Sequence, residues 1–216
     1  MLEFEKNLFN KGIRYVAGVD EVGRGPLAGP MVACAVILDL DKLLTINDVS
    51  DDWDASYYSQ ITDSKKLSPK KRDLLEEFIK NKAISFSLAE ISNRKLDEIG
   101  IAEATQISFF DSINGLSTKP NHILTDSYEI KKITKDGQTN IIRGDSKSIS
   151  IAAASIVAKV YRDNLMIEHS GKHPEYGFEK HKGYGTKAHI DAIHKHGICP
   201  LHRKSFEPVK TLLKIL

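Results

Sequence analysis

The pattern of hydrophobic and polar positions predicts five β-strands along the chain. A continuously apolar run indicates a strand buried on both faces, whereas a period of two indicates one buried face. Residues 31–38 are of the first kind. Residues 83–90 are of the second kind, and their buried face is expected to carry Ile84, Phe86 and Leu88. The predicted strands cover residues 14–19, 31–38, 83–90, 122–126 and 140–145.

Helical periodicity and capping signals predict helices between and after these strands. Ser68 at the N-cap and Pro69 in the first turn begin a helix whose apolar residues share one face. Residues 150–163 are apolar nearly all round, so this helix is expected to be buried against the sheet. Residues 39–60 hold six Asp and show little periodicity, which predicts a long exposed loop with no more than a short helical turn. Further helices are expected over residues 101–113, 187–196 and 206–214.

The order of these elements predicts an α/β fold. It is typical of a mixed sheet flanked by helices, with a small helical appendage at the C-terminus. The length of 216 residues suits one domain with such an appendage. We therefore expect residues 1–170 to form the main domain and residues 171–216 to form a helical segment packed on it.

The composition is typical of a soluble globular protein, with 41% hydrophobic and 28% charged residues. The longest apolar run, residues 31–38, is far shorter than the roughly 20 residues of a membrane span. The first residues carry two glutamates and no long apolar stretch, so they do not resemble a secretory signal. The two cysteines, Cys34 and Cys199, are too few for a disulfide framework, which favours a reducing, cytoplasmic location.

The small net charge of +2 hides an asymmetry along the chain. Residues 159–216 hold 11 Lys and Arg against 6 Asp and Glu, whereas residues 1–158 hold 20 against 23. A basic C-terminal quarter beside a body rich in carboxylates suits a polyanionic partner held next to bound metal. The alternative is an ordinary solvated helical surface.

Carboxylates stand at the ends of three predicted strands. Asp20 follows the first strand with Glu21 beside it, and Asp126 and Asp145 end two later strands. Because sites in open α/β sheets collect at strand ends, these groups are expected to converge and to raise one another's pKa values. A divalent cation would relieve that repulsion, and oxygen ligands favour Mg²⁺ or Mn²⁺. The alternative is a set of unrelated turn aspartates, since Asp is common where strands end.

Two further features surround Asp20. Adjacent strand residues point to opposite faces, so Asp20 and Glu21 can share one site only if the strand ends or bends there. The following Gly23-Arg24-Gly25 lets backbone amides approach a ligand, and arginine pairs with phosphate. The spacing to the next glycine does not fit a dinucleotide fingerprint. A plain glycine-rich turn is the alternative.

Motifs over most of the chain resemble those of ribonuclease HII. The opening AGVDEVGRGPLAGPMVACAVIL and the later GDSKSISIAAASIVAKVYRD are the most specific of them. The sister family, ribonuclease HIII, usually departs from the G-R-G pattern. The matching segments are residues 17–38, 63–68, 123–127, 144–163 and 176–206.

This resemblance implies a ribonuclease H-like fold and a metal-dependent endoribonuclease. The enzyme would cleave the RNA strand of RNA/DNA hybrids and nick duplex DNA on the 5′ side of a single embedded ribonucleotide. Its metal ligands would be Asp20, Glu21, Asp126 and Asp145, with Asp20 bridging two Mg²⁺ or Mn²⁺ ions. The products would carry a 3′-hydroxyl and a 5′-phosphate. We expect a monomer that binds nucleic acid and no membrane.

The resemblance also implies residues that bind the substrate. Gly23, Arg24 and Gly25 would read the ribose 2′-hydroxyl, largely with backbone groups, and Tyr184 would sit against the sugar at the cleavage junction. Lys65, before a helix N-terminus, would touch the phosphate backbone. Ser127 departs from the family, which usually has Gly after the third carboxylate. The acidic segment 39–62 is expected to point away from the substrate, because it would repel DNA.

Two other functions remain open from the sequence. One is a related nuclease that cuts four-way DNA junctions, and the other is an inactive module that binds hybrids. The intact acids argue against the second, because binding alone would favour basic residues. The requirement for a 2′-hydroxyl at the cut site separates the first from a ribonuclease.

Residues near the C-terminus offer a less specific signal. Seven of the eight histidines lie in residues 169–202, and Cys199 and His202 have C-x-x-H spacing. With no second ligand pair, surface histidines are favoured over a zinc site. Arg162 and Asp163 are expected to be structural partners.

Overall fold

The structure is a computed structural model that describes residues 1–45 and 53–214. Its centre is a five-stranded sheet with strand order β3-β2-β1-β4-β5. β1 pairs antiparallel with β2 and β2 with β3, whereas β1 pairs parallel with β4 and β4 with β5. The predicted mixed sheet is confirmed. The strands are β1 Val16–Val22, β2 Met31–Ile37, β3 Ser85–Ile91, β4 His122–Asp126 and β5 Gln138–Ile141.

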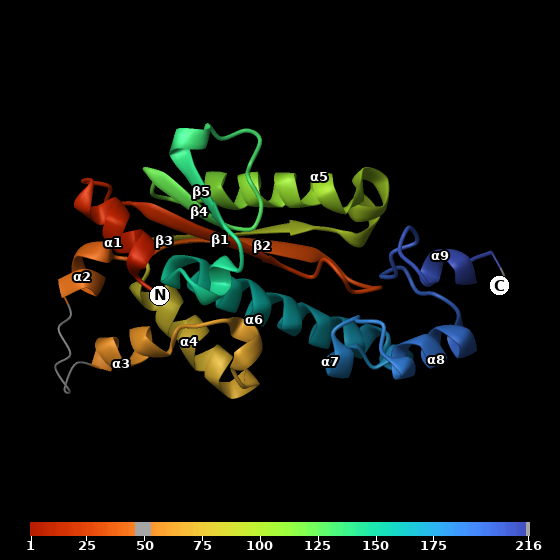
Figure 1. The fold of residues 1–216 in the computed structure, drawn as a ribbon. Helices are drawn as coiled ribbons and strands as arrows, with labels where there is room; N and C mark the ends of the chain where they lie inside the picture. The colour runs from red at the N-terminus through yellow and green to blue at the C-terminus, as the bar shows by residue number, and fades with distance from the viewer. Residues whose placement is uncertain (46–52, 215–216) are drawn as a thin grey trace.

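Helices cover both faces of this sheet (Figure 1). The long α5 lies over one face, and α6 and α4 lie over the other. No helix in the described part of the chain is long and apolar enough to cross a membrane. The α-helices are α1 Glu3–Asn10, α2 Leu40–Thr45, α3 Trp53–Gln60, α4 Pro69–Lys82, α5 Asn93–Asn114, α6 Ile149–Lys172, α7 Phe178–His181, α8 Lys187–His196 and α9 Val209–Leu212.

The predicted buried helix is confirmed as α6, which packs on β1 and β2. Ser148 caps its N-terminus by accepting a hydrogen bond from the amide of Ile151. Ala152, Ala153 and Ala154 are fully buried and allow the close approach that the sequence indicates. The chain after α6 packs back on it through a separate apolar cluster that includes Met166. The small C-terminal appendage is therefore part of the observed architecture.

The expected long loop over residues 39–60 is wrong, because α2 and α3 occupy most of its described part. Leu40 and Leu43 of α2 are buried, as is Tyr58 of α3. Lys42 and Lys82 both pair with Asp54, which offsets the acidic character of the segment. In Figure 1 these two helices lie at the end of the sheet opposite the β1–β2 turn.

The expected burial of the third strand is also wrong in part. Ile84 and Phe86 are exposed, with 39% and 37% of their surfaces accessible, whereas Ser85 is buried. β3 is an edge strand, and its small side chains face the end of α5, where Ser85 hydrogen-bonds Ser117 at 3.0 Å. The close packing of α5 on β3 therefore determines which face of this strand is covered, and that face carries small side chains.

Other boundaries differ from the predictions as well. β1 covers Val16–Val22, so Asp20 and Glu21 lie inside the first strand and do not follow it. α5 begins at Asn93, where Ser92 caps it, and it contains a break at Gly100 with φ +76°. β5 ends at Ile141, so Asp145 lies beyond the strand in the 3₁₀ turn η3, Gly144–Ser146. α9 is shorter than the predicted helix over residues 206–214.

Candidate active site

Asp20 and Glu21 lie near the carboxyl end of the central strand β1. The strand does not end at Asp20, because its pairing with β2 continues to Val22. Its pairing with β4, however, ends where Val19 lies opposite Thr125. The sheet therefore opens on the β4 side just at the two acids, which allows both to contribute to one site.

Asp126 and Asp145 are joined by a short backbone contact. The amide of Gly144 donates to the Oδ1 atom of Asp126 at 2.7 Å, which ties the η3 turn to the end of β4. A Cβ atom at position 144 would lie 2.5 Å from Ile151 and 3.4 Å from the Cα atom of Asp126. Glycine at this position thus permits the approach that brings Asp145 beside the strand ends.

The residue after Asp126 adopts an unusual conformation. Ser127, which stands where the family usually has Gly, has φ +62°. Its hydroxyl donates to the Oδ1 atom of Asp126 at 3.1 Å. Ser127 therefore adopts a left-handed conformation that glycine takes most readily.

The four carboxylates form one electrostatic unit. The pKa of Asp20 is raised to about 7, chiefly by burial; a hydrogen bond from Ser155 lowers it, and the charges of Asp126 and Asp145 add to the rise. Burial and the charge of Asp20 raise the pKa of Glu21 to about 8. Burial, followed by the charge of Asp126, raises the pKa of Asp145. Burial and the neighbouring charges together disfavour the ionised forms of Asp20, Glu21 and Asp145, and a bound cation would relieve this cost.

The donor set fits a hard divalent cation. All four groups offer oxygen, and the Oε2 atom of Glu21 is buried without a hydrogen-bond partner. Within residues 1–45 and 53–214, no three Asp, Glu, His or Cys side chains already form a complete metal-holding group.

The glycine-rich segment borders Glu21. The Nε atom of Arg24 lies 3.7 Å from the Oε1 atom of Glu21, and its guanidinium also donates to Thr105 of α5 at 2.8 Å. A Cβ atom on Gly25 would lie 3.8 Å from the ring of Tyr184. The structure therefore brings Gly25 and Tyr184 together beside the acids, although the two residues are far apart in sequence.

Lys65 lies beside Asp145 in the acidic cluster. Its Nζ atom lies 3.8 Å from the Oδ2 atom of Asp145, and its side chain is 81% exposed. It is held in the 3₁₀ turn η1, Ser64–Lys66, which Asp63 caps. An exposed lysine beside Asp145 is available to a phosphate group.

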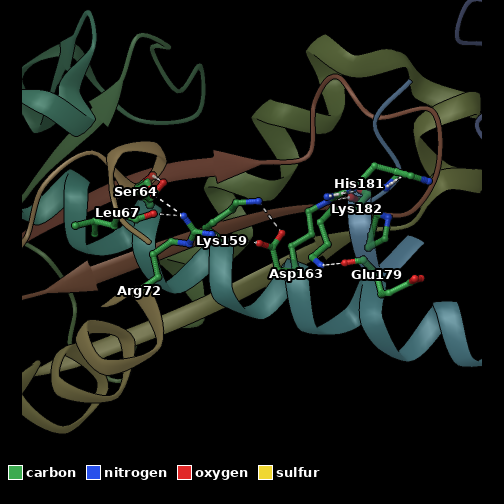
Figure 2. Close-up of polar contacts among 12 residues, drawn as sticks. Ser64, Leu67, Arg72, Lys159, Asp163, Glu179, His181 and Lys182 are labelled. Atoms are coloured by element: carbon green, nitrogen blue, oxygen red, sulfur yellow. Dashed lines mark hydrogen bonds and ion pairs between the residues drawn. The ribbon is translucent and has the colours of Figure 1, made fainter. Parts of the chain in front are cut away.

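The structure corrects the expectation that Arg162 and Asp163 are partners of each other. Arg162 does not pair with Asp163: it donates to the backbone carbonyls of Ala28, Pro30 and Lys182. Asp163 instead accepts from Lys159 at 2.7 Å, as Figure 2 shows, and lies 4.0 Å from Arg72.

The histidines are likewise not all at the surface. His189 and His202 are fully buried and contact each other through their Nε2 atoms at 3.1 Å. Sequence reasoning also missed Ser155 and Arg203. Ser155 directly follows the three alanines of α6 and lies on the buried side of that helix, where it hydrogen-bonds Asp20. Arg203 carried no local signal.

Comparisons with known proteins find similarity over almost the whole chain. The family model described as Ribonuclease HII matches residues 17–209. A Ribonuclease HII of Clostridium beijerinckii is 52% identical over 95% of this chain and 72% of its own length. One from Acholeplasma laidlawii is 46% identical over 99% of this chain and 97% of its own length.

Solved structures share the fold. The ribonuclease H2 of Pyrococcus horikoshii OT3 superposes with a TM-score of 0.75 at 23% identity, over 93% of this chain and 97% of that chain. Bst-RNase HIII in complex with Mn²⁺ superposes with a TM-score of 0.69 at 19% identity, over 93% of this chain and 70% of that chain. These likenesses confirm the ribonuclease H-like architecture.

Proposed function

The chain belongs to the ribonuclease HII family of metal-dependent ribonucleases H, and from this premise we propose that it hydrolyses the RNA strand of RNA/DNA hybrids and nicks duplex DNA on the 5′ side of a single ribonucleotide. The observation that carries the proposal is the electrostatic coupling of Asp20 to Asp126 and Asp145. Carboxylates with raised pKa values, gathered from separate chain segments, favour cation binding over a structural role.

The four acids would hold the cations. Asp20 is the best candidate for the ligand shared between two ions, because it interacts with Glu21, Asp126 and Asp145 alike. When bound, paired Mg²⁺ or Mn²⁺ ions supply an activated water and stabilise the leaving 3′-oxygen, which gives 3′-hydroxyl and 5′-phosphate ends.

Gly25 and Tyr184 support a preference for ribose. The 2′-hydroxyl is the only group that distinguishes RNA from DNA at a given residue. Backbone amides of the Gly23–Gly25 segment would hydrogen-bond that hydroxyl, and the exposed ring of Tyr184 would pack against the sugar. A deoxyribose would leave these polar groups unpaired, which costs binding free energy.

The proposal also covers the role of Lys65, the location of the protein and its oligomeric state. Lys65 would contact a backbone phosphate near the acids. Cys34 and Cys199 are both free and buried, which is in keeping with a reducing, cytoplasmic location. We propose that the protein acts there as a monomer, with the segment after residue 170 remaining packed on the catalytic body.

Hydrolysis of a labelled RNA strand in an RNA/DNA hybrid tests the general activity. The wild type and Asp20→Asn would be compared in Mg²⁺, in Mn²⁺ and in EDTA, with a four-way DNA junction as the second substrate. We expect cleavage of the hybrid by the wild type in at least one metal and none in EDTA. Cleavage of the junction alone would favour the related nuclease, and hybrid binding without any cleavage would favour the binding module.

A further inference from the structure

Two buried arginines lie beneath the glycine-rich turn. Arg162 of α6 and Arg203, from the segment after α8, are both fully buried. Together they donate seven hydrogen bonds, and every one ends on a backbone carbonyl oxygen. Burying a guanidinium is costly unless its donors are satisfied, so this arrangement strongly fixes the backbone that accepts the bonds.

Arg203 holds the part of the turn that borders the active site. The Nη1 atom of Arg203 donates to the carbonyl of Arg24 at 3.0 Å, and its Nη2 atom donates to the carbonyl of Gly23 at 2.6 Å. The same guanidinium also binds the carbonyls of Gly29 and Pro30 at 2.9 and 3.1 Å. Arg203 therefore links both ends of the β1–β2 connection.

The geometry of the peptide bond converts these contacts into a constraint on the amides. In a planar trans peptide, a carbonyl and the N–H of the next residue point in opposite directions. When Arg203 draws in the carbonyls of Gly23 and Arg24, the N–H groups of Arg24 and Gly25 point away from it. Neither N–H donates to an acceptor within the part of the chain that the structure describes. Two adjacent donors are thus presented together, beside Tyr184.

His202, the residue before Arg203, helps to hold Tyr184 in place through a chain of hydrogen bonds. The amide of Cys199 donates to the Nδ1 atom of His202 at 2.9 Å, so the proton of that ring lies on Nε2. His202 then donates to His189, and the Nδ1–H of His189 donates to the carbonyl of Tyr184 at 3.0 Å. The tyrosine and the two amides are therefore fixed from one short C-terminal segment.

We infer that Arg203 is a positioning residue for sugar recognition: it orients the Arg24 and Gly25 amides toward a ribose 2′-hydroxyl without touching the substrate. This inference rests on the proposed ribonucleotide recognition and assigns its specificity to a residue outside the catalytic cluster. Lysine at position 203 would keep the charge but could not span four carbonyl acceptors.

The test compares Arg203→Lys with Arg162→Lys. Arg162 is a matched control because it is also a buried guanidinium bound to backbone carbonyls, those of Ala28, Pro30 and Lys182, but it donates to neither Gly23 nor Arg24. Affinity is measured with Ca²⁺ for a duplex that contains one ribonucleotide and for the same all-DNA duplex. We expect Arg203→Lys to lower the ratio of the two affinities by about tenfold, roughly the contribution of one well-placed hydrogen bond. Arg162→Lys should keep the ratio within about threefold of the wild type.

Each result has a definite meaning. An unchanged affinity ratio in Arg203→Lys overturns the inference. An equal fall of the ratio in both variants overturns it as well, because it would show that any substitution of a buried arginine here disturbs the fold. A wild type without any preference for the ribonucleotide would instead refute the proposed function. Melting temperatures are measured for each protein. If Arg203→Lys does not fold, Arg203→Gln, which keeps two donors without a buried charge, takes its place with the same expected fall.

Discussion

Gly18 of β1 lies directly against the backbone of Ser150 in α6. A Cβ atom at position 18 would stand 2.0 Å from the carbonyl carbon of Ser150 and 2.4 Å from the amide nitrogen of Ile151. Asp20 is two residues further along the same strand, so it shares this face and hydrogen-bonds Ser155 on the next turns of α6. The contact between β1 and α6 therefore determines how deeply the carboxylate of Asp20 is buried.

We expect Gly18→Ala to destabilise the fold by about 3 kcal/mol or more, because the obstacle is backbone that cannot move aside. Urea denaturation measures the change. Gly171→Ala is the matched control, since Gly171 lies in α6 and a Cβ there meets nothing within 4 Å. That variant should be neutral or more stable by up to about 1 kcal/mol. Equal effects at the two positions would contradict the close approach.

In the absence of metal, Asp20→Asn should stabilise the protein at pH 8. The pKa of Asp20 in the fold is about 7, above its ordinary value of 3.8, so its ionisation destabilises the fold as pH rises. The gain from the substitution should grow between about pH 4 and pH 7, reach on the order of 2–4 kcal/mol and disappear below pH 4. Denaturation in EDTA across this range tests it. A variant less stable than the wild type at pH 8 would contradict the raised pKa of Asp20.

Metal binding should release protons near neutral pH. With pKa values of about 7 and about 8, Asp20 and Glu21 are partly protonated at pH 7, whereas cation ligation needs their ionised forms. Metal affinity should therefore rise as pH increases through 7 and 8. Titration calorimetry in buffers of different ionisation enthalpy counts the protons, and Asp20→Asn should release fewer. Mn²⁺ binding with no proton release would contradict the assigned ligands.

The stability of the C-terminal segment should depend on two buried histidines. Burial lowers the pKa of His189 and of His202 to about 4, so both must stay neutral in the fold. Stability is then full above pH 6.5 and falls as pH drops from 6.5 toward 4, by up to about 3 kcal/mol per histidine. Urea denaturation at pH 7.5 and pH 5 measures the loss, which His202→Gln should reduce. The exposed His194→Gln should leave it unchanged, and an equal change in both variants would contradict this account.

The sheet and its principal helix could be predicted because their signals are local. The apolar run over residues 31–38 and the nearly all-apolar helix at residues 150–163 are each buried for reasons visible in the sequence. Asp126 was correctly placed at the end of its strand. Its role as a ligand, like that of the other three acids, remains a proposal.

The misses share a different cause: they depend on partners distant in sequence. Asp145 was assigned to a strand, but the contact of Gly144 with Asp126 places it in a turn instead. Phe86 was expected to be buried by alternation, yet the close packing of α5 requires small side chains on the covered face. The buried Arg203 interacts with carbonyls more than 170 residues away, which no local pattern could reveal.

The most direct test of the central claim is an end-labelled cleavage assay on a duplex with one ribonucleotide in a DNA strand. The wild type in Mg²⁺ or Mn²⁺ should produce a single nick immediately 5′ of the ribonucleotide, leaving a 3′-hydroxyl, and should leave the matched all-DNA duplex intact. Asp20→Asn should not cut, although it folds. Failure of the wild type to cut in either metal while it still binds the duplex, or cutting of both duplexes alike, would contradict the account.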